Sequence, residues 1–203
     1  MSDEFKIIGF HGTFVEAIDS IVKEGFHIVR RDNHWLGQGV YFYDNSPLAR
    51  WWISRNSKSD HQKRDKGTSF VVIKAQLSST VDSVLDLDSV EGVNSFYQKI
   101  HENWDVFRTV QFSNDEHKNL CFVLDVLSEQ YGFKIIIKTF ESLDPSYGLV
   151  NTRAFDRELF KLNVRYKERQ ICVRSNPCIK ILELEYPDTE YTFKSKIRFS
   201  WSD

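Results

Sequence analysis

The 203-residue sequence is poor in the residues that mark linkers and disulfide frameworks. It has only 9 glycines, 4 prolines and 1 methionine, which argues against low-complexity stretches and flexible linkers. Its 3 cysteines, Cys121, Cys172 and Cys178, are an odd and widely spread set that is typical of a reducing compartment. Cys172 and Cys178 have no paired cysteine or histidine nearby, so we expect no metal site.

The sequence also lacks long apolar runs and a strong charge of either sign. No run approaches the roughly 20 apolar residues that span a bilayer, and the acidic start Met1–Glu4 lacks the basic region and apolar core of a signal peptide. We therefore expect a cytoplasmic protein with no membrane partner. The formal charge of −2 provides no global basic field for nucleic acid, although it does not exclude a local basic patch.

Aromatic side chains are abundant, at 14% of the residues. Several fall within one short part of the chain: Trp35, Tyr41, Phe42, Tyr43, Trp51 and Trp52. With 41% hydrophobic and 28% charged residues, the composition is that of an ordinary globular protein. The length and the absence of a composition break favour one domain over residues 1–203.

The apolar patterns predict a mixed order of strands and helices, with several strands not separated by helices, which favours an α+β fold. Thr13 is a candidate N-cap after a turn at His11–Thr13, and Gly25 a candidate C-cap. A polar loop is expected over Ser54–Gly67. The expected helices are Val15–Glu24, Leu48–Ile53, Asn94–Trp104 and Asn114–Tyr131. The expected strands are Ile7–Phe10, Val40–Tyr43, Ser69–Leu77, Val84–Leu87, Phe133–Phe140, Gln170–Val173, Ile179–Leu184 and Glu190–Ser200.

Three segments suggest chemistry: Phe10–Thr13 (Phe-His-Gly-Thr), Leu36–Phe42 (Leu-Gly-Gln-Gly-Val-Tyr-Phe) and Arg169–Val173 (Arg-Gln-Ile-Cys-Val). A glycine at a strand end allows a ligand to approach the backbone closely. A helix carrying Trp52 could return beside Tyr41 and provide two aromatic walls for a flat ring.

These segments resemble the ADP-ribosyltransferase superfamily, in its poly(ADP-ribose) polymerase and diphtheria-toxin branch with a His-Tyr-Glu signature. The resemblance covers Ile8–Trp52 and, more weakly, Glu168–Leu184, while residues 75–160 match no motif. The Ala-x-x-Trp spacing of Ala49 and Trp52 is similar to bacterial members. The resemblance implies a split, mostly antiparallel sheet with flanking helices, and a helical insertion within 75–160.

The resemblance also implies roles for individual residues. His11 would bind the adenosine-side ribose of NAD, and Gly12, with Thr13 shaping the turn, would hold the nicotinamide carboxamide. Tyr41 and Trp52 would stack on the nicotinamide, with Ala49 near the carboxamide. NAD would be the substrate, and no metal is implied.

The third signature position departs from the family, because Gln170 stands where the glutamate belongs. A glutamine can orient a ribose hydroxyl but is neither an anion nor a general base. Glu168 lies two residues earlier and would share a strand face with Gln170, so it could supply the missing carboxylate.

The implied activity is transfer of a single ADP-ribose from NAD to a nucleic acid or protein, in a toxin or anti-phage effector with a possible antitoxin partner. The stretch 153–169 has six basic residues against three acidic ones, with aromatics among them, which suits a single-stranded nucleic acid. The alternatives are an NAD glycohydrolase and a non-catalytic NAD- or ADP-ribose-binding module. An RNA 2′-phosphotransferase also begins with His-Gly-Thr, but Phe10 and Gly39–Tyr41 argue against it. The other histidines are predicted to be surface residues: His34, His61, His101 and His117.

Overall fold

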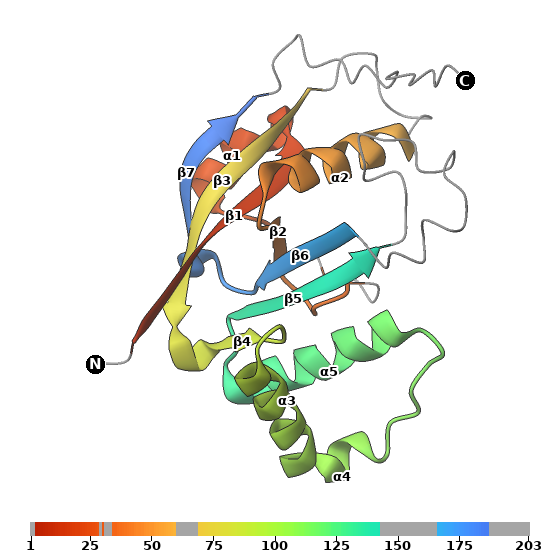
Figure 1. Cartoon of the computed structure of the whole chain (residues 1–203). Coiled ribbons are helices and arrows are strands. Elements are labelled where there is room, and N and C mark those ends of the chain that lie inside the picture. The colour runs from red at the N-terminus through yellow and green to blue at the C-terminus, as the bar shows by residue number, and fades with distance from the viewer. Residues whose placement is uncertain (1–2, 29, 31–33, 60–68, 143–165, 187–203) are drawn as a thin grey trace, which may run out of the picture.

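The computed structural model describes residues 3–28, 30, 34–59, 69–142 and 166–186. In this part of the chain it is an α+β protein built on a seven-stranded mixed sheet (Figure 1). The strand order is β4-β5-β6-β2-β1-β3-β7. The strands are β1 (Glu4–Phe14), β2 (Val40–Tyr43), β3 (Phe70–Thr80), β4 (Val84–Asp86), β5 (Ile135–Ser142), β6 (Tyr166–Val173) and β7 (Ile179–Glu185).

The strand pairs are antiparallel except for β4 and β5, which run parallel at one edge of the sheet. β1 pairs with β3 along its whole length, from Glu4 opposite Thr80 to Phe14 opposite Phe70. By contrast, β1 and β2 are in register only at Phe10 and Tyr43. The sheet therefore opens between β1 and β2 beyond that pair.

The helices cover the two faces of the sheet and connect its strands (Figure 1). They are α1 (Ile18–Glu24), α2 (Ser46–Ser59), α3 (Val90–Glu102), α4 (Trp104–Phe107) and α5 (Glu116–Tyr131), with 3-10 turns at Val15–Ala17, Val81–Ser83 and Asn176–Cys178. The region 75–160 thus carries α3, α4 and α5. Ser89 and Asp115 cap the N-termini of α3 and α5 through their side-chain oxygens.

Alternating residues of the central strands separate the core into two faces. On one face Phe42, Ile73 and Ile137 pack with Ile18 and Phe26 from the α1 region. On the other face Ile136 and Cys172 pack under α5, and Tyr43 and Val72 pack under Ala49 of α2. The α2 and α5 helices therefore share one face of the sheet.

Most of the predicted strands are confirmed, including β2 with its exact bounds. The predicted turn at His11–Thr13 is wrong, because β1 continues through Phe14 and the N-cap position of the following turn is Phe14, not Thr13. Pairing with β3 along all of β1 overrides the turn tendency of the glycine. The C-cap at Gly25 is confirmed, with φ of 84°.

The expected loop over Ser54–Gly67 is wrong for its first part, since α2 continues through Ser59. Polar residues continue a helix readily when they face solvent, so polarity alone did not mark its end. The rest of that loop and the predicted strand Glu190–Ser200 lie outside the described residues.

Candidate functional site: a buried carboxylate beside an aromatic cavity

Two polar side chains are buried together on β6. Glu168 is 3% exposed and Gln170 is 7% exposed, and both lie on the face of the sheet that carries α2 and α5. The Gln170 Nε2 group donates a hydrogen bond of 2.7 Å to Oε1 of Glu168. Gln170 lies opposite Tyr43 of β2, so the pair sits close to where β1 and β2 separate. Gln170 thus holds the Glu168 side chain in one orientation on β6.

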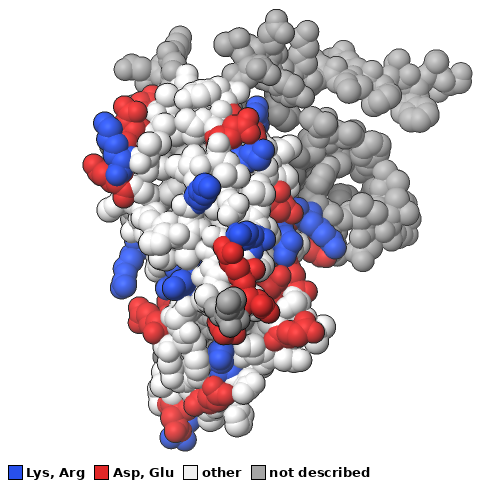
Figure 2. Space-filling model, turned by 90° about the vertical axis from the view of Figure 1, so that its left-hand side faces the viewer, with Lys and Arg blue, Asp and Glu red and all other residues white. Residues whose placement is uncertain are grey.

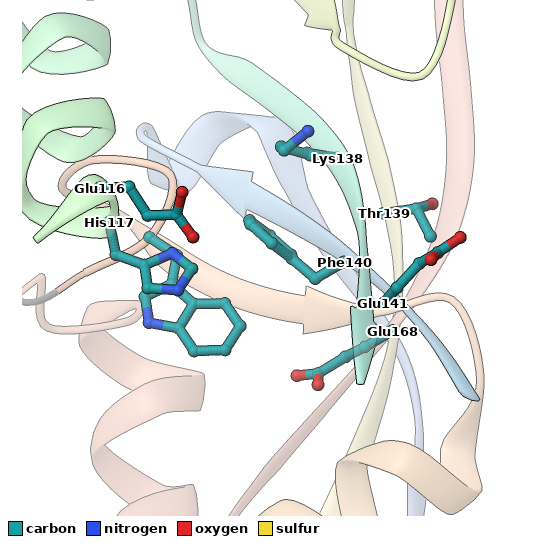
Figure 3. Close-up of a pocket in the computed structure, with 8 residues that line it drawn as sticks. Glu116, His117, Lys138, Thr139, Phe140, Glu141 and Glu168 are labelled. Atoms are coloured by element: carbon teal, nitrogen blue, oxygen red, sulfur yellow. The ribbon is translucent and has the colours of Figure 1, made fainter. Parts of the chain in front are cut away.

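Glu168 also lines a cavity of about 340 Å³ at the N-terminal end of α5, here called the Glu168 cavity. Three aromatic side chains line it: Trp35 from the loop before β2, His117 from α5 and Phe140 from β5. Figure 3 shows the Glu168 carboxylate on the side of the strands where His117 and Phe140 lie, whereas the Glu141 carboxylate points away from these two rings. The remaining lining residues are Glu116, Lys138, Thr139 and Glu141.

The three rings are in mutual contact. Trp35 and His117 are stacked with centroids 4.4 Å apart and planes within 10°. Phe140 meets Trp35 edge-on at 4.8 Å and His117 at 5.9 Å. Offset stacking and edge-to-face contacts of this kind stabilise aromatic pairs beyond their buried area. The cavity therefore has a wall of three contacting aromatic rings and, on β6, a carboxylate.

The loop that carries Trp35 is held by Tyr41 and by α5. The Tyr41 hydroxyl donates to the carbonyl of Gly37 at 2.7 Å and accepts from the N–H of Leu36 at 2.8 Å. Burial raises the pKa of this phenol above its ordinary range, so Tyr41 stays protonated. Asp125 of α5 accepts from the N–H of Gln38 at 2.8 Å and from Arg174 at 2.6 Å. The loop conformation is thus fixed on two sides.

His11 lies on the opposite face of the sheet from Glu168, Gln170 and the Tyr41 ring. Its ring meets Phe26 edge-on at 5.2 Å and lies 5.6 Å from Phe42, within the core that packs against α1. Its Nδ1 lies 2.7 Å from the backbone carbonyl of Tyr41. Because a carbonyl only accepts, Nδ1 carries the proton of the neutral ring. His11 therefore bridges β1 and β2 where their ladder stops.

Burial lowers the pKa of His11 below 6.5, an effect that the hydrogen bond to Tyr41 opposes. As the pH falls below about 6.5, the His11 ring becomes protonated in the unfolded chain before it does so in the folded protein. The free energy of unfolding therefore falls, by at most about 1.4 kcal/mol for each pH unit. We expect His11→Asn to be less stable than the wild type at pH 7.5, but to lose less stability between pH 7.5 and pH 5.5. Denaturant unfolding at the two pH values measures this difference.

The exposed His101 on α3 provides the control. The wild type and His101→Asn should lose stability in parallel as the pH falls. If His11→Asn also followed the wild type in parallel, the buried neutral state of His11 would be contradicted.

The glycine of the first motif is covered by protein. A Cβ atom on Gly12 would lie 2.4 Å from the carbonyl oxygen of Ala49 and 3.0 Å from Ile53, both on α2. The absence of a side chain at Gly12 thus allows α2 to pack on β1, and Ala49 is fully buried there. Thr13 lies within β1, opposite Val71, and not in a turn. Trp52 is 44% exposed on α2 and is not among the described residues that line the Glu168 cavity.

The structure therefore brings together only part of the predicted set. It joins Glu168 to Gln170 in one hydrogen bond, and it packs Gly12 against Ala49. It separates the His11 ring from the Tyr41 ring by the thickness of the sheet.

Most of the basic stretch 153–169 lies outside the described residues. In its described end, Arg169 pairs with Asp86 at 3.2 Å and with Asp88 at 3.3 Å, so its charge is locally balanced. On the face of the molecule in Figure 2, basic and acidic side chains are interspersed. The described surface in this view therefore offers no extended basic patch.

Sequence reasoning missed the residues that line the cavity beside Glu168. His117, which was predicted to be a surface residue, is half-buried, and its ring stacks on Trp35 and lines the cavity. His34 likewise packs against Tyr41, with ring centroids 5.2 Å apart. The only sequence feature that could have indicated Trp35 as a cavity residue was the high aromatic content of its segment. Phe140 was predicted only as the last residue of a strand.

Two further observations concern metals and membranes. Within the described ranges, no group of three or more His, Cys, Asp and Glu side chains is arranged to hold a metal ion. Of the helices from α1 to α5, none is both long and apolar enough to cross a membrane.

All three cysteines are free and buried, and burial raises the pKa of the Cys172 thiol to about 12.

Comparison with known proteins places the chain beside a relative without an assigned activity. No family model matches the sequence. The chain is similar to the uncharacterized protein MJ0359 of Methanocaldococcus jannaschii, with 26% identity over 200 residues. The match covers 90% of this chain and 88% of the relative, so the likeness extends over nearly the whole length of both.

Proposed function

We propose that this protein is a mono-ADP-ribosyltransferase that cleaves NAD and transfers ADP-ribose to a nucleic acid or protein. The observation that carries the proposal is the buried Glu168 carboxylate, held by Gln170 on β6 and directed into an aromatic cavity. It supplies an anion two residues from the position where the resemblance implies a glutamate. The sheet that opens between β1 and β2 is also compatible with the split sheet that the resemblance implies.

The proposed reaction breaks the bond between the nicotinamide nitrogen and C1′ of the adjoining ribose. The electron pair of that bond leaves with nicotinamide, which becomes neutral, and the ribose develops oxocarbenium character. A nucleophilic atom of the acceptor then bonds to C1′ and loses its proton. In this scheme the carboxylate of Glu168 stabilises the ribosyl cation and accepts that proton.

Gln170 acts in this scheme as a positioning residue. Its amide donates to one carboxylate oxygen of Glu168 and fixes the orientation of that group. The cavity of about 340 Å³ is large enough for the nicotinamide end of NAD, whereas the adenosine end must lie outside it.

Incubation with NAD labelled in the adenine moiety, with and without a cell lysate, tests the proposal. We expect acid-insoluble label that nuclease or protease releases, according to whether the acceptor is nucleic acid or protein. If free ADP-ribose forms and no macromolecule retains the label, the activity is that of an NAD glycohydrolase and the proposed transfer is wrong. NAD that binds and stays intact would indicate a binding module and overturn the proposed catalysis.

A further inference from the structure

The loop before β2 is held in place by side chains that lie outside it. The N–H of Leu36 and the carbonyl of Gly37 both bond to the hydroxyl of Tyr41, at 2.8 and 2.7 Å. The N–H of Gln38 donates to Oδ1 of Asp125 on α5 at 2.8 Å. Backbone groups that are covered by protein need such partners. The position of the loop therefore depends in part on Asp125, which is distant from it in the sequence.

Asp125 also forms an ion pair with Arg174, the residue that follows β6. The Nη1 group of Arg174 donates to Oδ1 of Asp125 at 2.6 Å, and the two side chains are 14% and 23% exposed. The backbone N–H of Arg174 donates to the carbonyl of Lys134 at 2.9 Å, which fixes the start of this side chain. Removal of one partner from a largely buried pair leaves the other charge uncompensated. One oxygen atom of Asp125 thus links α5, the end of β6 and the loop before β2.

Gly37 shows how closely the loop lies against this ion pair. Its φ is +81°, in the region that favours glycine. A Cβ atom there would lie 2.6 Å from Nη1 of Arg174 and 2.6 Å from Oδ1 of Asp125. The ion pair thus occupies the space that a side chain at position 37 would need, and the loop backbone packs directly on it.

The same loop contacts α5 at a second point, in the wall of the Glu168 cavity. There the ring of Trp35 stacks on the ring of His117, with centroids 4.4 Å apart. His117 and Asp125 are both on α5, about 12 Å apart along the helix axis. The loop therefore lies along α5 between these two contacts. Because Trp35 is close to Gln38 in the chain, a shift of Gln38 away from Asp125 would also move Trp35.

A second ion pair provides a comparison at another place in the sheet. Arg50 of α2 and Glu185 of β7 are 3.3 Å apart, and the Glu185 side chain is 23% exposed, the same fraction as that of Asp125. The Ser46 hydroxyl donates to Glu185 and accepts from Arg50. These contacts join α2 to β7 through side chains, whereas Asp125 bonds to the backbone of a loop.

We infer that Asp125 and Arg174 are positioning residues that hold Trp35 in the wall of the Glu168 cavity. Neither of them is among the described residues that line the cavity, so they act through the loop. The charged groups that do line it, Lys138 among them, are unchanged when the pair is removed. The effect of the pair on NAD binding rests on the proposed function, whereas the placement of Trp35 does not.

The indole N–H signal of Trp35 measures this placement by NMR of the full chain with isotope-labelled tryptophan. Trp35→Phe assigns the signal. Asp125→Ala should move it toward the signal of free tryptophan, because the ring leaves its stacked position. Arg174→Met should have the same effect, and Arg174→Lys, which keeps the charge, should move the signal less. Glu185→Ala removes an equally covered carboxylate and should leave the signal in place.

Steady-state kinetics of NAD cleavage separates positioning from a general loss of stability. We expect Asp125→Ala to lower kcat/KM by about tenfold, mostly by raising KM, because Glu168 and Gln170 stay in place on β6. Arg174→Lys should have a KM closer to that of the wild type than Arg174→Met has. Glu185→Ala should lower the thermal stability and leave KM unchanged.

The placement of Trp35 and the reaction can fail separately. An unmoved Trp35 signal in Asp125→Ala, or an equal movement in Glu185→Ala, would overturn the inference. If Asp125→Ala does not fold, Asp125→Asn, which keeps the acceptor for Gln38 but loses the charge, replaces it in both measurements. A signal that moves while KM stays unchanged would contradict the effect on NAD binding. If the wild type leaves NAD intact, the proposed function fails, and the Trp35 signal still decides whether the ion pair positions the loop.

Discussion

Replacement of Glu168 by glutamine is expected to lower NAD cleavage by about 100-fold or more, because the variant loses the anion that stabilises the ribosyl cation. The substitution keeps the size of the side chain and an oxygen that still accepts from Gln170 Nε2. Folding and NAD binding should therefore change much less than the rate. Single-turnover cleavage at saturating NAD, with a parallel thermal unfolding curve, separates these quantities.

Variants of Gln170 distinguish the two candidate positions for the acid. Gln170→Ala should lower the rate less than Glu168→Gln does, since it removes only the group that orients the carboxylate. Gln170→Glu would place a second carboxylate against Glu168 in a buried site, where two like charges oppose each other. Higher activity in Gln170→Glu than in the wild type would show that position 170, and not Glu168, is the catalytic one. Glu129→Gln, a change of the same type on the surface of α5, should have wild-type activity.

The second large effect is on stability. Gly12→Ala should lower the free energy of unfolding by about 2–3 kcal/mol, because its Cβ would collide with α2. That atom would lie 2.4 Å from the Ala49 carbonyl oxygen, a backbone atom that can move only with its helix. Chemical denaturation with a two-state fit measures the change.

Gly132 provides the matched glycine-to-alanine control. Its φ is +73°, and the described structure leaves open space within 4 Å of the position where a Cβ would lie. Gly132→Ala should cost only about 1 kcal/mol, from the left-handed backbone alone. Equal destabilisation by the two substitutions would show that contact with α2 is not what requires glycine at position 12.

The strands that are easiest to predict from the sequence are those whose apolar residues stand close together in the chain. The β5 run of isoleucines and the β2 segment were both predictable because branched and aromatic residues favour strands. The end of β1 was not, since His11–Thr13 has the composition of a turn and becomes a strand only through pairing with β3. That partner lies in a distant part of the chain, beyond the reach of a local pattern.

The same distinction applies to the candidate site. Glu168 and Gln170 are two residues apart, so strand alternation alone predicted that they share a face. The contact of Trp35 with His117 and Phe140 joins three separate segments, and no spacing in the sequence indicates it. His11 shows the limit of a motif, because neither its place within β1 nor the face on which its ring lies was predicted from the sequence.

The strand order has a consequence for how the sheet assembles. The central strands β2, β1 and β3 come early in the chain, but β6 pairs with β2 and β7 pairs with β3 on the two sides of this unit. Until residues 166–185 are synthesised, both sides of the early unit are open edges that can pair with another chain. Non-local pairing of this kind slows folding. Newly made chains thus pass through an aggregation-sensitive interval that ends when the two late strands close the edges.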